Sequence, residues 1–290
     1  MSNQVVDNKD CLSPQEVAQT LSEKVMPKKA DLRTYKMIAL AIAAGAFVAY
    51  GAQASLTVMS GTVENLSWGF AKLLGAIVFT TGLMMVVLTG SELFTGNVLM
   101  AFSVMEKKVS IFKLLKNWSI VYFGNFIGSI VIAYLVFASG FSHANSDALG
   151  VLTLTTAQGK VELSFMEAFS RGILCNWLVC LAVWMASCSR HVVGKIFAIF
   201  FPILTFVASG YEHSVANMFY IPSGIFIKSV PSVVEASGLS SEQLVNLNWS
   251  SFAIDNLIPV TLGNIVGVVI FVVLLFWIVY LKEEHIQEKK

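Results

Sequence analysis

The sequence predicts an all-α polytopic membrane protein built from two similar halves. Of its 290 residues, 56% are hydrophobic and 13% are charged, and the mean hydropathy is +0.73. A soluble domain carries about 25% charged residues. Several apolar segments are long enough to cross a hydrocarbon core of ~30 Å as helices. Two of these segments are interrupted by the same polar pattern, which indicates two homologous halves.

The polar N-terminal segment contains a helix start signal. Ser13-Pro14-Gln15-Glu16 is a capping box with proline at the first helical position. Val17, Leu21 and Val25 then recur at helical spacing. We expect a short amphipathic surface helix over about 14–24, ended by Pro27. The expected domain organisation is a cytoplasmic N-terminal segment (1–34), a six-span transmembrane domain (35–282) and a cytoplasmic tail (283–290).

Six spans follow from the apolar segments. An even number of crossings places both termini on one side, and most loop Lys and Arg residues fall on that side. The positive-inside rule makes it cytoplasmic. The expected spans are 36–58, 68–105 with a break at 90–97, 114–139, 164–188, 196–227 with a break at 209–217, and 252–281.

Three sequence echoes relate the halves. Both breaks read G-x-E-x-x-x-x-N, and a later span of each half carries G-N-x-x-G. Three spans per half is an odd number, so the halves are inverted, with a transport site expected at their interface. The paired residues are Gly90, Glu92 and Asn97 with Gly210, Glu212 and Asn217; Gly124, Asn125 and Gly128 with Gly263, Asn264 and Gly267; and, more weakly, Ala41 and Gly45 with Ala168 and Gly172.

Polar residues at membrane depth are costly unless they face a cavity, so the breaks predict a permeation path. His213 is the strongest candidate, because imidazole can donate, accept and titrate near neutral pH. Inversion brings Thr95 near it, either to hold one histidine tautomer or to cap a half-helix. Lys160, with Lys72 and Arg171, is a candidate vestibule cation or a structural charge.

The other break residues favour structural roles. Glu92 and Glu212 are expected to accept hydrogen bonds from loop N–H groups. Asn97 and Asn217 are expected to cap the second half-helices, with Ser214 beside the latter. Asn125 and Asn264 either bond the broken loops or line the pore.

Enzymatic and ATP-driven functions lack their motifs. The four histidines are scattered without metal spacing, and no Walker motif or G-x-S-x-G is present. We therefore expect no catalytic residue, metal, cofactor or nucleic-acid partner. Cys11, Cys175, Cys180 and Cys188 show no disulfide spacing.

The chain resembles the formate/nitrite transporter family, most closely its formate channels, over about 14–282. The specific motifs are Gly90–Thr95, Asn117-Trp118 with Tyr122–Asn125, Asn176–Trp184, Ala208–Met218, and Asp255–Val260 leading to Gly263-Asn264.

That resemblance implies an aquaporin-like homopentamer in a bacterial inner membrane, with one pore per protomer. His213 would be the central pore histidine and Thr95 its partner, while Glu92, Phe94 and Asn97 would belong to a gating loop. The resemblance also implies an outer constriction of Phe79 and Phe206, an inner one of Leu83, Leu93 and Val179, and polar path residues Lys160, Asn176 and Asn264.

We expect formate to be the substrate, with proton coupling and pH gating left open. Partners would then be the anion, protons, membrane lipid and other copies of the chain. A nitrite or hydrosulfide channel of the same architecture is the alternative. A pore for uncharged solutes or a membrane enzyme ranks third.

Overall fold

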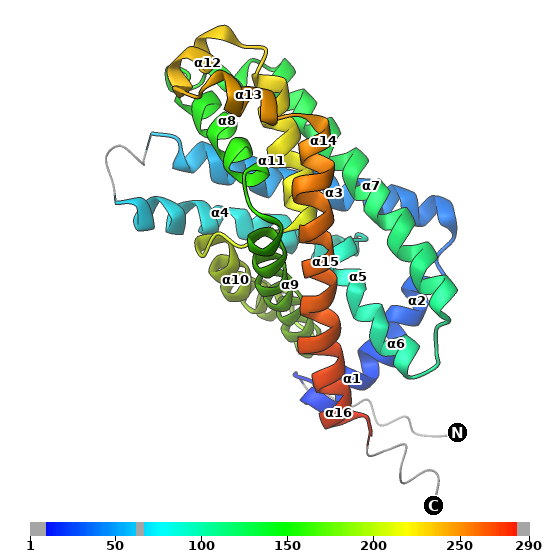
Figure 1. The fold of residues 1–290 in the computed structure, drawn as a ribbon. Coiled ribbons are helices and arrows are strands. Elements are labelled where there is room, and N and C mark those ends of the chain that lie inside the picture. The colour runs from blue at the N-terminus through cyan, green and yellow to red at the C-terminus, as the bar shows by residue number, and fades with distance from the viewer. Residues whose placement is uncertain (1–9, 62–66, 283–290) are drawn as a thin grey trace, which may run out of the picture.

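The structure is a computed structural model that describes residues 10–61 and 67–282 (Figure 1). Within those ranges the elements are helices, apart from one isolated β-bridge between Cys11 and Ser189. The predicted tail 283–290 and most of the turn after the first span lie outside the described residues. In Figure 1, α1 and α16 lie at one end of the molecule and α12 and α13 at the other.

The first half contains an N-terminal helical segment, two unbroken spans and one broken span. Its elements are α1 (Pro14–Thr20), a π-helical turn (Leu21–Val25), α2 (Met26–Ala30), α3 (Thr34–Met59), α4 (Trp68–Thr89), α5 (Phe94–Asn97), a 3₁₀ turn (Val98–Met100), α6 (Ala101–Met105) and α7 (Ile111–Ala138).

The second half has the corresponding spans and an additional helical loop. Its elements are a 3₁₀ turn (Phe141–His143), α8 (Ala148–Val161), α9 (Phe165–Cys188), α10 (Val192–Ala208), α11 (Ser214–Ile227), α12 (Pro231–Ser237), α13 (Ser241–Asn246), α14 (Trp249–Ser251), a π-turn (Phe252–Leu257), α15 (Ile258–Val268), a second π-turn (Val269–Leu274) and α16 (Leu275–Tyr280).

The predicted helical membrane fold is confirmed. In the described part of the chain, five helices are long and apolar enough to span a membrane. The segments Phe94–Met105, Val192–Ala208 and Ser214–Ile227 are shorter apolar helices. The second and fifth spans are therefore the broken ones. Gly90 and Gly210, at the two breaks, both have φ of 72°, a left-handed conformation that glycine adopts without steric cost.

The breaks are shorter than predicted. Residues 94–97 and 214–217 were assigned to the breaks, but the structure places them in α5 and at the start of α11. The extended backbone is confined to a few residues after each glycine. Few backbone groups then need side-chain partners, which matters because unpaired ones are costly away from water.

The sequence predicts that the N-terminal helix ends at Pro27, but in the structure the helical segment continues to Ala30. The turn before it is π-helical, and the N–H of Met26 donates to the carbonyl of Leu21. This wider turn shifts the hydrogen-bond register just before the proline, where an α-helical register would bring the ring against a carbonyl.

Helices α8, α12 and α13 were not predicted. Helix α8 packs against α11 and α12, in a region where the sequence predicts a loop. Its mixed composition, with polar residues on several sides, gave no clear helical periodicity. The helix matters because it carries Lys160 to the second break.

The glycines of G-N-x-x-G permit the tightest helix crossings. A Cβ at Gly128 would lie 2.0 Å from the Ile42 carbonyl oxygen, and one at Gly267 would lie 2.3 Å from that of Ile173. Helix α7 thus crosses α3 in the first half as α15 crosses α9 in the second. Small residues at such crossings let backbones approach closely in lipid.

Gly128→Leu is expected to prevent folding, because its side chain would overlap the α3 backbone. The measurement is the yield of folded protein after detergent extraction, by size-exclusion chromatography. Gly69→Ala is the control, since a Cβ there meets nothing within 4 Å. Similar yields of Gly128→Leu and wild type would contradict the close crossing.

Candidate permeation site

Each break is held by one asparagine from a neighbouring span. Asn125 on α7 accepts from the backbone N–H of Phe94 at 2.8 Å and donates to the carbonyls of Ala41 (2.8 Å) and Glu92 (2.9 Å). The bonds to Phe94 and Glu92 satisfy backbone groups that the break leaves without helical partners, and the bond to Ala41 ties the break to α3. The side chain is fully buried.

Asn264 on α15 makes the equivalent bonds in the other half. It accepts from the N–H of Ser214 at 2.9 Å and donates to the carbonyls of Gly172 (2.9 Å) and Glu212 (3.0 Å). The sequence leaves open whether Asn125 and Asn264 bond the broken loops or line the pore. In the structure, both asparagines bond the loops. Asn264 was also a predicted path residue, and its amide atoms are all engaged in these bonds.

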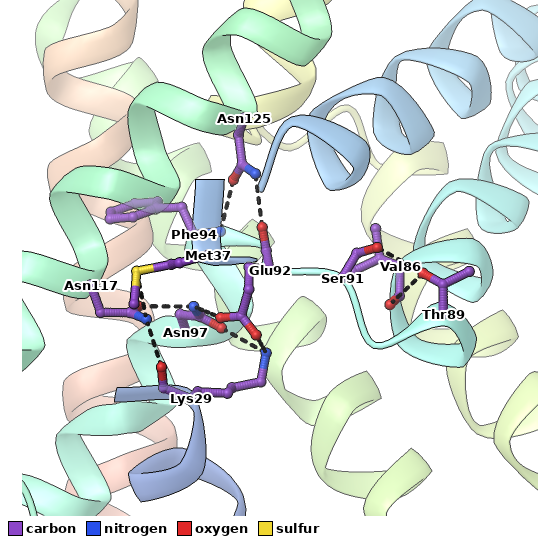
Figure 2. A network of polar contacts seen from close by, with 10 residues as sticks. All are labelled: Lys29, Met37, Val86, Thr89, Ser91, Glu92, Phe94, Asn97, Asn117 and Asn125. Carbon is purple, nitrogen blue, oxygen red and sulfur yellow. Dashed lines mark hydrogen bonds and ion pairs between the residues drawn. The ribbon is translucent and has the colours of Figure 1, made fainter. Parts of the chain in front are cut away.

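A buried ion-pair cluster lies beside the first break (Figure 2). Lys29 on α2 contacts Glu92 at 2.8 Å and Asn97 at 3.1 Å. Asn97 donates to Glu92 at 2.6 Å and to Asn117 on α7 at 2.9 Å. The amide of Asn117 donates in turn to the Lys29 carbonyl at 3.4 Å. The buried charge of Glu92 is therefore neutralised by the partly buried Lys29, as a buried charge requires.

An equivalent cluster lies beside the second break. Lys160, near the end of α8, contacts Glu212 at 2.8 Å. Asn217 donates to Glu212 at 2.6 Å and to Asn256 at 2.7 Å. Asn256 donates to the Lys160 carbonyl at 2.9 Å. One difference is that the side-chain Oδ1 of Asn217 is buried without a hydrogen-bond partner, whereas the Oδ1 of Asn97 accepts from Lys29.

These clusters correct two predictions. The carboxylates of Glu92 and Glu212 accept from lysine and asparagine side chains rather than from loop N–H groups. Asn97 and Asn217 are not caps, because each lies inside a helical turn and bonds the preceding glutamate. In each cluster the lysine ammonium takes the place of the expected loop N–H groups as hydrogen-bond donor to the carboxylate, and it also carries a full positive charge.

The clusters also correct the predicted alignment of the first spans. Asn125 bonds the carbonyl of Ala41, and Asn264 bonds that of Gly172. Ala41 therefore corresponds to Gly172, one helical turn beyond the Ala168 of the weak echo. The same offset relates Lys29 to Lys160, a pair that the sequence reading missed.

The sequence motifs contain Asn117 and Asn256 but predict no role for them. A signal for their role was present, since each precedes the asparagine of G-N-x-x-G by the same number of residues. Two asparagines two helical turns apart face the same side of a span.

His213 and Thr95 are in contact, as the inversion predicted. The Thr95 hydroxyl lies 2.8 Å from His213 Nε2. On the other side of the ring, the backbone N–H of Ala216 donates to Nδ1 at 3.1 Å, so His213 is the N-cap of α11. Because Nδ1 accepts, the neutral ring carries its proton on Nε2, which donates to the Thr95 oxygen. The hydroxyl keeps its own hydrogen for another acceptor.

Two cavities approach this pair from opposite sides. The first, which we call the outer cavity, has a volume of about 530 Å³. The second, the inner cavity, has a volume of about 240 Å³. The outer cavity is lined by residues that include Phe79, Phe206, His213, Lys72, Lys160 and Arg171, and the inner cavity by residues that include Leu83, Leu93, Val183, Leu21, Met26 and Lys29.

The predicted constriction residues lie between the cavities. The rings of Phe79 and Phe206 meet edge to face, with centroids 5.7 Å apart, and Phe206 stacks on His213 at 6.0 Å. Leu83 and Leu93 are the apolar wall on the inner side. Val179 is buried and lines neither cavity. The passage between the cavities is therefore apolar except at the His213–Thr95 pair.

The remaining predicted residues support this constriction. Asn176 donates to the carbonyls of Thr95 (3.2 Å) and Asn264 (2.8 Å), so it links α5, which follows the first break, to α15, whose Asn264 holds the second. Phe94 packs edge to face on Tyr122, with centroids 4.9 Å apart. The Ser214 hydroxyl is buried without a hydrogen-bond partner.

Two inverted half-units, two broken spans and two cavities separated by a constriction that holds a buried polar pair define a membrane transport protein. Residues 15–278 match the family model described as formate/nitrite transporter. The chain belongs to this family.

Similar proteins agree. A "Probable formate transporter" of Methanothermobacter thermautotrophicus is 43% identical over 263 residues, which is 86% of this chain and 90% of the relative. "Formate channel FocA" of Escherichia coli K12 is 40% identical over 276 residues, covering 94% and 96%. The solved "Pentameric formate channel with formate bound" is 39% identical, with a TM-score of 0.77 over 86% of this chain and 98% of that one.

Proposed function

We propose that the chain is a channel for formate and similar small monovalent anions, with one pore per protomer of a homopentamer. The observation that carries the proposal is the His213–Thr95 pair between two cavities, in a passage that is otherwise apolar. The named relatives support formate as the anion and the solved neighbour supports the pentamer. The charge bias of the loops supports an orientation with both termini cytoplasmic, and the Escherichia coli relative supports a bacterial membrane as the location.

The outer cavity attracts the anion. Lys72, Lys160 and Arg171 line it, and among the residues that the structure describes Glu212 is the only carboxylate that lines it with them. Lys160 is already paired with Glu212, so the attraction comes chiefly from the other two cations. Cations in a cavity with apolar walls raise the local concentration of anions.

The His213–Thr95 pair lowers the free energy needed to move an anion through the apolar passage. A bare anion there costs far more than one that receives hydrogen bonds. The Nε2–H of His213 supports the Thr95 oxygen, and the free hydroxyl hydrogen or Nε2–H itself donates to the anion. Transfer of a full proton would start from an imidazolium whose Nδ1–H faces the Ala216 N–H, so the cap geometry favours hydrogen bonding over proton donation.

The test compares fluxes of formate, nitrite, hydrosulfide and glycerol in one preparation of proteoliposomes. Formate ahead of the other solutes supports the proposal. Nitrite or hydrosulfide ahead would reassign the anion and keep the site, while free passage of glycerol would overturn anion selectivity.

Lys72→Gln is expected to lower the initial formate flux by about two- to fivefold at low ionic strength, with the difference shrinking in salt. The reason is the lost positive charge in the outer cavity. Lys116→Gln, outside both cavity linings, is the matched control. Equal losses in the two variants, or a loss insensitive to salt, would contradict electrostatic attraction.

A further inference from the structure

Two cysteines lie together where the chain enters its first helix. Leu12 donates its backbone N–H to the carbonyl of Cys188 at 2.9 Å, and Cys11 pairs with Ser189 in an antiparallel bridge. These backbone contacts place Cys11 directly beside Cys188. The residues are far apart in sequence, so only the fold brings the thiols together.

Neighbouring contacts hold this pairing in register. Asp10 accepts from the backbone N–H of Arg190 at 3.4 Å, and its carboxylate lies 3.1 Å from the Nε2 of His191. The pairing therefore extends on both sides of the thiols. It lies at the end of α9, the unbroken span that also carries Asn176.

The two thiols differ from the other cysteines in accessibility. Cys11 is exposed and Cys188 is partly buried, whereas Cys175 and Cys180 are fully buried in the transmembrane core. A small oxidant can reach the first pair and not the second. Exposed thiols with a second thiol in reach are the usual sites of reversible oxidation.

We propose that Cys11 and Cys188 form a reversible redox site, whose disulfide ties the start of the N-terminal helical segment to the end of α9. The proposed orientation places this site in the cytoplasm, where stable disulfides are rare and those that form are transient or redox-sensing. The oxidant is a small-molecule disulfide of the glutathione class.

The chemistry is thiol–disulfide exchange. The Cys11 thiolate attacks one sulfur of the small disulfide, a Cys11–S–S–R bond forms, and one RS⁻ leaves. The Cys188 thiolate then attacks the Cys11 sulfur, the Cys11–Cys188 bond forms, and the second RS⁻ leaves. The two protein thiols lose two protons and two electrons in total, and the small disulfide is reduced to two thiols.

The Cys11–Cys188 disulfide constrains the N-terminal helical segment, which lines the inner cavity. Downstream of Cys11, the side chains of Val17, Ala18 and Leu21 are fully buried against the transmembrane domain. Leu21 and Lys29 line the inner cavity, and Lys29 also pairs with Glu92. A disulfide removes the chain entropy that undocking would gain, so it favours the docked segment. A resulting decrease in formate flux rests on the proposed function.

The experiment treats the full-length protein in liposomes with glutathione disulfide or with dithiothreitol. Peptide mapping without reduction is expected to find the Cys11 peptide joined to the Cys188 peptide in wild type and in Cys175→Ala. Cys11→Ser and Cys188→Ser lack the link. Hydrogen exchange of the amides over 14–30 is expected to slow about tenfold in the oxidised protein and to recover with dithiothreitol.

Three results would overturn the proposal. They are a Cys11 that stays a mixed disulfide with glutathione, a link between subunits seen as a dimer on a non-reducing denaturing gel, and a linked protein whose amides exchange as fast as the reduced one. Flux is measured in parallel. If the reduced protein fails to pass formate, the proposed function fails, while the peptide and exchange results still decide this proposal.

Discussion

Replacing His213 with phenylalanine is expected to lower formate flux by about ten- to hundredfold, because a hydrogen bond to a charged group contributes about 1.5–3 kcal/mol. The ring is the donor to the Thr95 hydroxyl and lies in the narrow apolar passage beside Phe206. Phenylalanine fills the same space and donates nothing. The measurement is initial flux in proteoliposomes across a range of pH.

Variants at Thr95 distinguish the contribution of its hydroxyl to flux from that of the His213 ring. Thr95→Val removes the hydroxyl and keeps the shape, so it should lose flux as His213→Phe does, whereas Thr95→Ser should retain most of it. Because Nδ1 of His213 caps α11, each variant is first checked for pentamer formation by size-exclusion chromatography. Unchanged flux and an unchanged pH profile in folded His213→Phe would remove the histidine from the mechanism.

Replacing Asn125 with leucine is expected to destabilise the protein by about 2–6 kcal/mol. The change leaves the N–H of Phe94 and the carbonyl of Glu92 buried without partners, and it removes the additional bond to the Ala41 carbonyl of α3. Each unpaired group costs about 1–3 kcal/mol. The measurement is the thermal midpoint in detergent, which should fall by about 10 °C or more. Asn264→Leu is expected to match it, because that side chain makes the equivalent bonds.

The control for this pair is Asn248→Ala, a partly buried capping residue outside both breaks. Its midpoint should change by only a few degrees. A similar small change in Asn125→Leu would mean that water reaches the broken backbone and replaces the amide. A large change in only one of the two buried variants would show that the halves differ in how firmly their breaks are held.

The sequence was sufficient to predict the spans, the two breaks and the contact between His213 and Thr95. Each rests on a strong local signal: apolar length, glycine beside polar residues, or a repeated motif. The span ends were close, with 36–58 predicted against Thr34–Met59 observed. The breaks were predicted too long because polar residues such as Asn97 were taken as non-helical, although buried partners hold them inside a helix.

Other features depend on contacts between distant segments. Lys29 is expected only as a loop charge and Lys160 as a vestibule cation or structural charge, since nothing in their local sequence reveals the carboxylates they reach. The alignment of Ala41 with Gly172 requires the bonds made by Asn125 and Asn264. Small residues are common in both spans, so motif spacing alone selected an alignment that is wrong by one turn.

The matched bonds around the two breaks also identify Leu93 and His213 as counterparts, since each directly follows the glutamate of its cluster. An ancestral duplication would have given both positions the same residue, and they have since diverged. The surrounding lysines, glutamates and asparagines have kept nearly the same partners in both halves. New selectivities can therefore arise in this lineage at a single pair of positions, while the framework that keeps the broken helices folded is left unaltered.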